Sequence, residues 1–208
     1  MEVGIPPCRA FRVPHLRLRS FQDNATYVTL ACNVSWLVLT YRLPGSTSSA
    51  RVAVWREVRR SGALHVQRSV VAFPDHAAFR RAVERFRVLV AEAGGETLAL
   101  RAEPLGEPDA ARLTGAWNEA RAAEYAELRA ECGKFLAEIE HEFTIEKFTL
   151  AELEEEEAEL DKLQRWHERI AARDIHEAPG AGEASEALKE ADEALERYSR
   201  AVFERTQL

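Results

Sequence analysis

"WLVLTYRLPGSTSSARVAVWREVRRSGALHVQRSVVAFP", at residues 36–74, decides the expected fold. Its first segment, 36–43, is rich in aromatic and branched apolar residues and stops at a Pro-Gly pair, as a buried strand does. A turn rich in serine and threonine then leads into an expected helix over about 49–61, which a glycine ends. The apolar segment 63–73 follows. Its pattern predicts either one long strand or two short strands with a bend between them.

A second helix and a final strand complete this pattern. The helix is expected to begin after Asp75 as its N-cap, and its apolar residues are 4, 3 and 4 positions apart, at Phe79, Val83, Phe86 and Val90. Two glycines end the helix, and the alternating segment 96–102 is typical of a strand. The order strand, helix, one or two strands, helix, strand predicts an α+β fold with a ferredoxin-like (split βαβ) domain over residues 35–104.

The second half, residues 105–208, contains no strand signal and is expected to be an all-helical module. The first long helix has apolar residues spaced by 3 and 4, at Tyr125, Leu128, Cys132, Phe135 and Ile139. Thr149 and Glu152 form a capping-box pattern for the next helix, and its four glutamates at 154–157 are expected on the solvent side. A third helix repeats the heptad-like spacing, so the module is predicted to be a helical hairpin or a three-helix bundle.

Residues 1–34 differ from the rest of the chain. They contain three prolines and no sustained helical or strand period, so an irregular N-terminal extension is expected. Met1 is the only methionine, and translation that began at Val34 would make this extension an artefact of start-site choice. The alternative is a genuine arm that carries four arginines.

Charge is divided unevenly along the chain, whose formal net charge is −7. Residues 1–35 carry +2, residues 36–104 carry +5 and residues 105–208 carry −14. Every basic residue before Lys134 is an arginine, whose planar guanidinium suits phosphates, carboxylates and other oxyanions. A composition rich in arginine and alanine is also typical of a GC-rich bacterial genome, so codon usage explains the arginines equally well.

Six arginines are the candidate DNA-binding or oxyanion-binding residues: Arg42, Arg51, Arg56, Arg59, Arg60 and Arg68. Three of them project from the solvent face of the expected first helix. Arg51 instead falls between Ala50 and Trp55 on the apolar face, together with Val54 and Val58, so it must reach a carboxylate, a carbonyl oxygen or a bound anion. A salt bridge to the helical module is the simpler account. Arg42 and Arg68 are expected near Arg51, where a helix N-terminus also favours anions.

The sequence predicts no catalytic site, no cofactor and no metal site. It contains no G-x-S-x-G or Walker pattern, and His141, His167 and His176 lack the H-E-x-x-H or i,i+4 spacing of metal ligands. Three cysteines stand far apart without a C-x-x-C, and Cys132 occupies an apolar position where an inert core thiol is expected. Because no secretory leader and no apolar run of about 20 residues occurs, a cytoplasmic protein without a membrane span is expected.

Several segments resemble the ChrB family. They are "WLVLTYRLP", "SSARVAVWREVRRSGA", "VQRSVVAFP" and "AEAGGETLALRAEP", followed by "HEFTIEKFTLAELEEEEAELDKLQRW" and "IAARDI". The resemblance covers roughly residues 35–208 and implies a regulator of a bacterial chromate-resistance operon, one that senses chromate and controls transcription. Larger members carry an additional C-terminal domain, which this chain is expected to lack, so autonomous chromate sensing does not follow from the resemblance.

The first half is also similar to the ferredoxin-like domain of small CRISPR-associated nucleases and of phenylacetate-type repressors. In those nucleases the first strand ends with a metal-binding aspartate, whereas "TYRLP" has Arg42 there and no acidic residue nearby. The resemblance therefore does not imply metal-dependent phosphodiester cleavage, and it leaves both DNA binding and protein binding open.

The leading hypothesis is a cytoplasmic, non-enzymatic regulatory protein linked to chromate resistance. Its arginines are expected to contact DNA phosphates or an oxyanion, with chromate as the effector, and its helical module is expected to form a homodimer. The alternative is a non-catalytic protein-interaction module that does not bind DNA because its acidic helices neutralise the basic domain. A chromate reductase comes last, because the sequence offers no flavin, nicotinamide or reactive-thiol site.

Overall fold

The computed structural model describes residues 35–43, 45 and 48–206. All of them fall within the compact unit that runs from Ala31 to Leu208. The predictions for residues 1–34 lie outside the described residues. Within the described part, the chain forms a four-stranded sheet, five α-helices and one short 3-10 helix, so the predicted α+β class is confirmed.

The sheet is antiparallel throughout, and the strands lie in the order β2-β3-β1-β4. The strands are β1 (Trp36–Arg42), β2 (Leu64–Gln67), β3 (Val70–Pro74) and β4 (Glu96–Ala102). The segment 63–73 is therefore two strands rather than one, because the chain reverses at a tight turn in which Ser69 has a φ of 60°. β4 pairs with β1 in an uninterrupted register, whereas the pairing of β2 with β3 shifts between His65 and Gln67.

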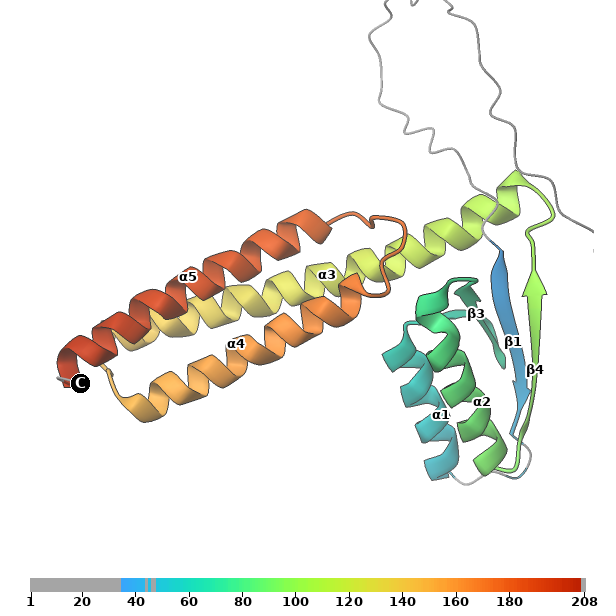
Figure 1. The fold of residues 1–208 in the computed structure, drawn as a ribbon, viewed down its shortest axis with the longest axis horizontal. Helices are drawn as coiled ribbons and strands as arrows, with labels where there is room; N and C mark the ends of the chain where they lie inside the picture. Colours follow the sequence, from blue (N-terminus) through green and yellow to red (C-terminus); the bar gives the residue numbers. More distant parts are fainter. Residues whose placement is uncertain (1–34, 44, 46–47, 207–208) are drawn as a thin grey trace, which may run out of the picture. The chain divides into compact units, whose positions relative to one another are not determined.

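Two helices, α1 (Ser48–Ser61) and α2 (Arg80–Glu92), cover one face of the sheet (Figure 1). The ring centroids of Tyr41 on β1 and Phe86 on α2 lie 5.1 Å apart, so Tyr41 points to the face of the sheet that the two helices cover. The apolar stripe predicted for the second helix is confirmed, since its members are all buried in the core: Phe79, Val83, Phe86 and Val90. Phe79 belongs to the 3-10 helix η1 (Ala77–Phe79), which precedes α2.

The predicted apolar face of α1 is wrong at Trp55. Val54 and Val58 are buried as expected, but the Trp55 side chain is 54% exposed. Glu57 is buried instead, with Oε2 at 2.5 Å from Arg60 Nη2 and Oε1 at 3.5 Å from Arg85 Nε on α2. The two ion pairs compensate the buried charge of Glu57, so this residue can lie on the side of α1 that packs against the core. The buried side of the helix is therefore rotated toward Glu57, and Trp55 is left facing solvent.

The expected N-cap at Asp75 is also wrong. His76 caps the 3-10 helix, with its Nδ1 accepting from the Ala78 N–H at 3.3 Å, and Phe79 precedes α2 without a side-chain cap. Asp75 instead pairs with Arg101 on β4, with 2.6 Å between Oδ2 and Nε. The chain therefore enters this helix through a 3-10 turn, which the sequence pattern did not reveal.

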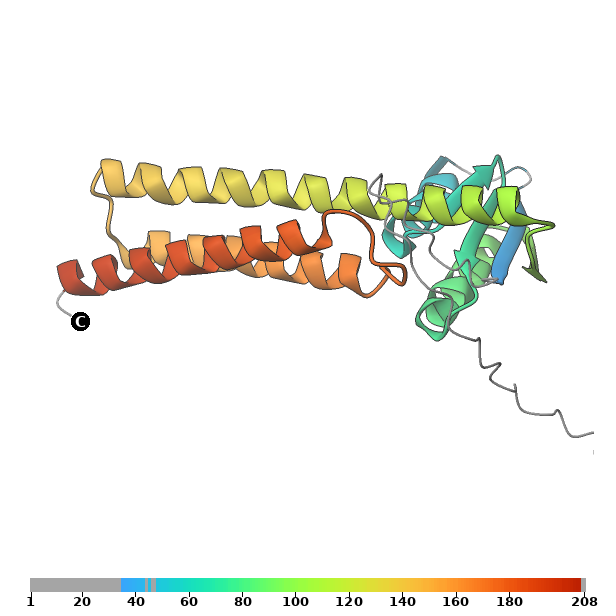
Figure 2. The same cartoon turned by 90° about the horizontal axis from the view of Figure 1, so that it is seen from above.

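The helical half consists of α3 (Glu107–Thr144), α4 (Leu150–Ala171) and α5 (Ala181–Thr206). These helices pack around one apolar cluster, so of the two predicted arrangements the structure adopts the three-helix one (Figures 1 and 2). The five apolar positions predicted for the first of these helices are all buried. The Thr149 hydroxyl oxygen accepts from the Glu152 N–H at 3.3 Å, which confirms the predicted cap of α4.

The N-terminal part of α3 belongs to the core of the α/β half. Trp117 is fully buried, with ring centroids 6.1 Å from Trp36 on β1 and 5.2 Å from Phe79. A residue of α3 thus completes the core that the sheet, α1 and α2 build. The expected domain boundary after residue 104 stays a prediction.

One of the four glutamates at 154–157 is not on the solvent side of α4. Glu156 is only 6% exposed and faces the groove between α3 and α4. Burial, together with the nearby carboxylates of Glu138 and Glu142 on α3 and Glu152 and Glu155 on α4, raises the pKa of Glu156 to about 7. The prediction of a wholly solvated glutamate run is therefore wrong at this position.

Candidate functional site

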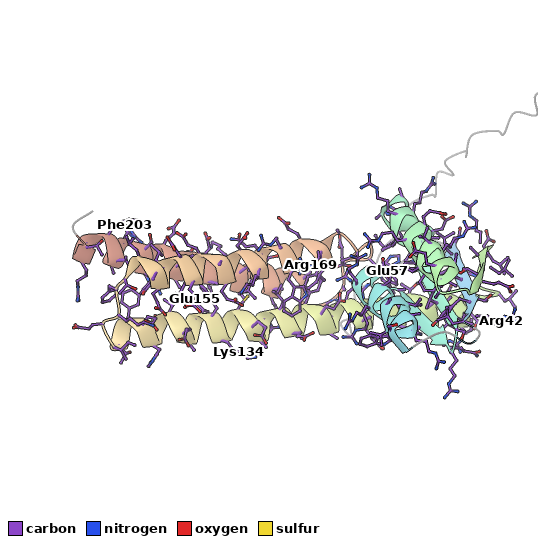
Figure 3. All side chains as sticks on the ribbon, turned by 90° about the horizontal axis from the view of Figure 1, so that it is seen from below. Arg42, Glu57, Lys134, Glu155, Arg169 and Phe203 are labelled. Atoms are coloured by element: carbon purple, nitrogen blue, oxygen red, sulfur yellow. The ribbon has the colours of Figure 1, made fainter. Side chains whose placement is uncertain are left out.

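The six predicted arginines are all exposed and lie in two regions of the α/β half. Three lie in the C-terminal half of α1, at Arg56, Arg59 and Arg60. Because α1 runs back along the sheet after β1, this region is remote from Arg42 at the end of β1. Figure 3 shows this separation, because it labels Arg42 and also Glu57, which lies beside Arg56 on α1.

The second region contains Arg42, Arg51 and Arg68. Arg42 Nη2 donates to Glu96 Oε2 on β4 at 3.1 Å, so Arg42 pairs with a carboxylate of the protein where a bound phosphate or oxyanion was expected. Arg51 is exposed, and its predicted position on the apolar face is wrong for the same reason as that of Trp55. Arg68 lies on the exposed turn between β2 and β3. The three-arginine anion pocket at this end stays a prediction.

The α1 arginines line one depression together with side chains of α3 and of the α4 end. We call it the arginine surface, and its residues are Trp55, Arg56, Arg59, Arg60, Glu124, Glu127, Trp166, Arg169 and Arg173. Its volume is about 460 Å³, and it is shallow and open to solvent. Figure 3 shows Arg169 on α4 beside the α/β half. Five guanidinium groups and two carboxylates leave this surface with a net positive charge.

Buried Arg121 on α3 positions the end of α1. Its Nη1 donates to the Gly62 carbonyl oxygen at 3.1 Å, and its guanidinium carbon lies 4.8 Å from the centroid of the Trp117 ring. Gly62 has a φ of 70°, and a Cβ at this position would lie 2.7 Å from Arg121 Nη1. Gly62 was expected only to end the helix. Because it has no side chain, it also leaves room for the Arg121 guanidinium at the C-terminal end of α1.

Arg173, just after α4, makes a second connection to α1. Its Nη1 donates to the Arg60 carbonyl oxygen at 3.0 Å, and its Nη2 donates to Glu124 Oε2 at 3.0 Å. Burial lowers the pKa of Arg173, while the Glu124 carboxylate raises it. Cations near a helix C-terminus are favourable, because the free carbonyl groups there carry partial negative charge. Arg173 therefore holds α1, α3 and α4 together.

The connection between α4 and α5 is held by Asp174, the neighbour of Arg173. Its Oδ2 accepts from the Tyr125 hydroxyl at 3.2 Å, and its Oδ1 accepts from the Ala178 N–H at 3.0 Å. Burial and the adjacent Asp174 carboxylate raise the pKa of Tyr125 to about 12, so its hydroxyl remains a donor. These bonds fix the backbone that carries Arg173.

The five arginines of the arginine surface differ in whether their guanidinium groups already pair with other side chains of the chain. Arg60 pairs with Glu57 and Arg173 pairs with Glu124. Arg59 lies over the exposed Trp55 ring, 5.7 Å from its centroid. Within the described residues, the side chains of Arg56 and Arg169 make no hydrogen bond or ion pair. Two guanidinium groups beside an exposed indole are thus available to an anionic ligand.

Sequence reasoning found the arginines of α1 but missed those after residue 104. Arg169 and Arg173 lie more than 100 positions along the chain in a half that carries −14, so their charge was hidden by the surrounding glutamates. Trp166 is half-buried, because it packs against the core of the helical half and also lines the arginine surface. The signal in the sequence was the pair Arg169 and Arg173, spaced by four, of which the first lies in the last turn of α4 and the second just after the helix.

Other chemistry is not supported by the described part of the chain. Cys132 is fully buried, and burial raises the pKa of its thiol, which makes it a poor nucleophile. No group of three or more His, Cys, Asp or Glu side chains among the described residues is arranged to hold a metal ion. None of the helices within residues 48–206 has the long uncharged apolar run that a bilayer crossing requires.

Comparison with known proteins places the chain in a family. The family described as "Protein ChrB, N-terminal" matches residues 51–208, which is more than half of the chain. A search of curated proteins gave no match. The chain belongs to the ChrB N-terminal family, and the matched region contains every residue of the arginine surface.

Proposed function

We propose that this protein is a regulatory protein linked to chromate resistance, and that it binds DNA phosphates through the arginine surface. The link to chromate resistance rests on membership of the ChrB family. The binding mode rests on one observation: two exposed arginines, Arg56 and Arg169, flank the same depression, and their side chains pair with none of the described residues. Basic side chains supply a large share of the affinity of proteins for nucleic acid, because they neutralise phosphates and release counterions.

The fold is compatible with this use. We assign the α/β half to the ferredoxin-like class, because its chain order β-α-β-β-α-β and its sheet order β2-β3-β1-β4 follow the split βαβ pattern. The C-terminal end of α1 is fixed by Arg121 and Arg173, so the α1 arginines start from a rigid frame. A rigid frame lowers the entropic cost of binding, because fewer groups must be ordered when the ligand arrives.

A second candidate is a protein-interaction module that does not bind DNA. It is favoured by Glu57 and Glu124, which already pair with two of the five arginines, and by Glu127 in the same depression. If these carboxylates neutralise the arginine surface, no salt-sensitive DNA binding will be found. The two candidates therefore make opposite predictions for one measurement.

The test is binding of the full chain to its own upstream DNA across a salt series, with and without chromate. We expect affinity to fall steeply as salt rises. The double variant Arg56→Ala/Arg169→Ala should bind more weakly and should reduce the slope of log affinity against log salt by about 2, or about 0.9 per lost phosphate contact. The matched control is Arg165→Ala/Arg197→Ala, which removes two exposed arginines of the bundle.

Each outcome separates the alternatives. Equal slopes for both double variants would remove the arginine surface from the proposal. No binding at low salt would favour the interaction module. If chromate or sulfate weakens DNA binding of the unaltered chain but not of the Arg56→Ala/Arg169→Ala variant, the arginine surface also takes an oxyanion effector.

A further inference from the structure

The edge strand β4 has an outer edge that no other described strand covers. It is the last strand in the order β2-β3-β1-β4, and among the described strands it pairs with β1 alone. Along an edge strand every second residue directs its N–H and C=O groups outward, where another strand can bind them. Within β4 the central residues Leu98, Ala99 and Leu100 are all exposed, with Leu98 at 57% and Leu100 at 49%.

The two edges of the sheet are built differently. β2, at the opposite edge, has four residues and a register shift between His65 and Gln67, and both features hinder addition of a further strand. β4 has seven residues, a regular register and no proline or lysine. Long, regular and apolar edges are the ones to which a further strand adds, so β4 is the edge open to a partner.

The two leucines lie on the face of the sheet opposite to α1 and α2. Leu98 is paired with Thr40 and Leu100 with Val38, whereas the Tyr41 ring one position away contacts α2 on the other face. Facing residues of an antiparallel pair point to the same side of the sheet, so both leucines project from the face without these helices.

We propose that β4 is a homodimer interface, in which a second copy of the chain adds its own β4 antiparallel to this edge with Ala99 on the two-fold axis. The occupant is a second copy because the strand complements itself. In the register centred on Ala99, Leu98 of each chain faces Leu100 of the other, and Thr97 faces Arg101. No charged residue faces a like charge, and a small residue lies on the axis.

Other registers are less favourable. A two-fold axis perpendicular to the sheet places the helix-covered faces of both chains on one side of the combined sheet. A residue can therefore face only a residue from the same face of the other chain. Centring on Leu98 would place Glu96 opposite Leu100, and centring on Leu100 would place Glu96 opposite Pro104. Only the register centred on Ala99 pairs both leucines with leucines.

The neighbouring helix α2 supports the same symmetry. Arg85 reaches Glu57 on α1, so the side of α2 that carries Glu84 and Arg87 faces away from α1 and toward the β4 edge. Glu84 and Arg87 form an exposed ion pair 3.1 Å long. A two-fold axis through β4 makes the two α2 helices antiparallel, which brings Glu84 of one chain toward Arg87 of the other. The charges on the two copies are therefore complementary.

The register is tested by disulfide formation in the full chain after replacement of Cys8 and Cys32 by serine. Under mild oxidation, Ala99→Cys should give a covalent dimer. Leu98→Cys alone should not, whereas Leu98→Cys mixed with a Leu100→Cys chain should. Along an antiparallel pair of strands, facing residues alternate between hydrogen-bonded pairs, which are farther apart, and non-hydrogen-bonded pairs, which are closer. Either the Ala99 pair or the Leu98–Leu100 pair is therefore of the closer type that a disulfide requires. Absence of covalent dimer in both would overturn the proposal.

The interface is tested independently by sedimentation across a range of concentrations. The unaltered chain should reach twice its 23.4 kDa mass. The variant Leu98→Lys/Leu100→Lys should raise the dimer dissociation constant at least about tenfold, because four lysines would meet at the interface. Leu105→Lys is the control, since Leu105 is 99% exposed outside β4, and circular dichroism checks that each variant is folded.

A monomer at all concentrations would overturn the proposal, and so would a dimer that the β4 variant leaves unchanged. The second result would direct the search to the helical module, where the sequence predicts the dimer contact. The inference does not rest on the arginine surface, because DNA binding and self-association are measured separately.

Discussion

Replacement of Glu156 by glutamine is expected to stabilise the protein at neutral pH. The side chain is 6% exposed in the groove between α3 and α4, where Glu138 and Glu142 approach from α3. The lysines of this region are already paired with other carboxylates: Lys134 with Glu131, Lys162 with Glu159, and Lys147 with Glu152 at 2.6 Å. Tyr198 approaches from α5, and burial together with the carboxylates of Glu142, Glu152 and Glu156 raises the pKa of Tyr198 to about 12. Glutamine keeps the shape of Glu156 and removes its charge.

The magnitude follows from the pKa of about 7 in the folded chain against 4.5 for the free group. A raised pKa means that the folded state holds a proton that the unfolded state has lost, so the free energy of unfolding falls as pH rises from about 4.5 to about 7. Each unit of pKa shift corresponds to about 1.4 kcal/mol, so the full cost of this ionised carboxylate is about 3 kcal/mol. About 1 kcal/mol of this cost is already present at pH 5, where the carboxyl group is mostly ionised in the unfolded chain, and nearly all of it is present at pH 8. Below pH 4.5 the cost disappears.

The assay is urea unfolding at pH 5, 6, 7 and 8, followed by circular dichroism. The difference in free energy of unfolding between Glu156→Gln and the unaltered chain should be about 1 kcal/mol at pH 5 and should grow to about 3 kcal/mol at pH 8. Glu155→Gln is the matched control, because Glu155 is the exposed neighbour on the same helix (Figure 3). It removes one negative charge from the groove without removing a buried one.

The reasoning would be refuted by a difference that does not depend on pH. It would also be refuted if Glu155→Gln gave the same pH-dependent gain, because the effect would then come from net charge and not from burial. A destabilised Glu156→Gln variant at pH 8 would show that the ionised carboxylate contributes to the fold.

Three further predictions concern stability and reactivity. Arg121→Met should lower the free energy of unfolding by about 3 kcal/mol in urea titrations, since it leaves the buried Gly62 carbonyl oxygen without its donor. Thr149→Ala should cost about 1 kcal/mol in the same titrations, because the first turn of α4 loses its cap. Cys132, with the two other cysteines replaced by serine, should react with iodoacetamide only in denaturant, and rapid alkylation of the folded chain would contradict its burial.

Much of the fold could be predicted from the sequence because periodic patterns record burial directly. The stripe Phe79, Val83, Phe86 and Val90 indicated a helix with one packed side, and all four are buried. The segment 63–73 was ambiguous because an apolar run cannot distinguish one strand from two. The deciding feature was a local reversal at Ser69, a residue that seldom adopts a positive φ.

The candidate site was predicted less well, because it depends on partners that are remote in the sequence. A helical wheel placed Trp55 inside, since it counts the tryptophan as apolar and Glu57 as polar. Arg85 reverses this choice by pairing with Glu57 from another helix. Burial of Glu156 is a similar case, because the surrounding residues of α3 decide it and its own neighbours along α4 do not.

The arginine surface illustrates why charge alone is an unsafe guide to binding residues. Arg173 is one of its guanidinium groups, but its side chain is only 13% exposed, and it donates to Arg60 on α1 and to Glu124 on α3. Its replacement would loosen the frame and weaken binding together, so the loss could not be assigned to either cause. Arg56 and Arg169 lack such internal partners in the described part of the chain, and their removal leaves that frame intact. A change in salt dependence for these two arginines therefore reports on the ligand rather than on the fold.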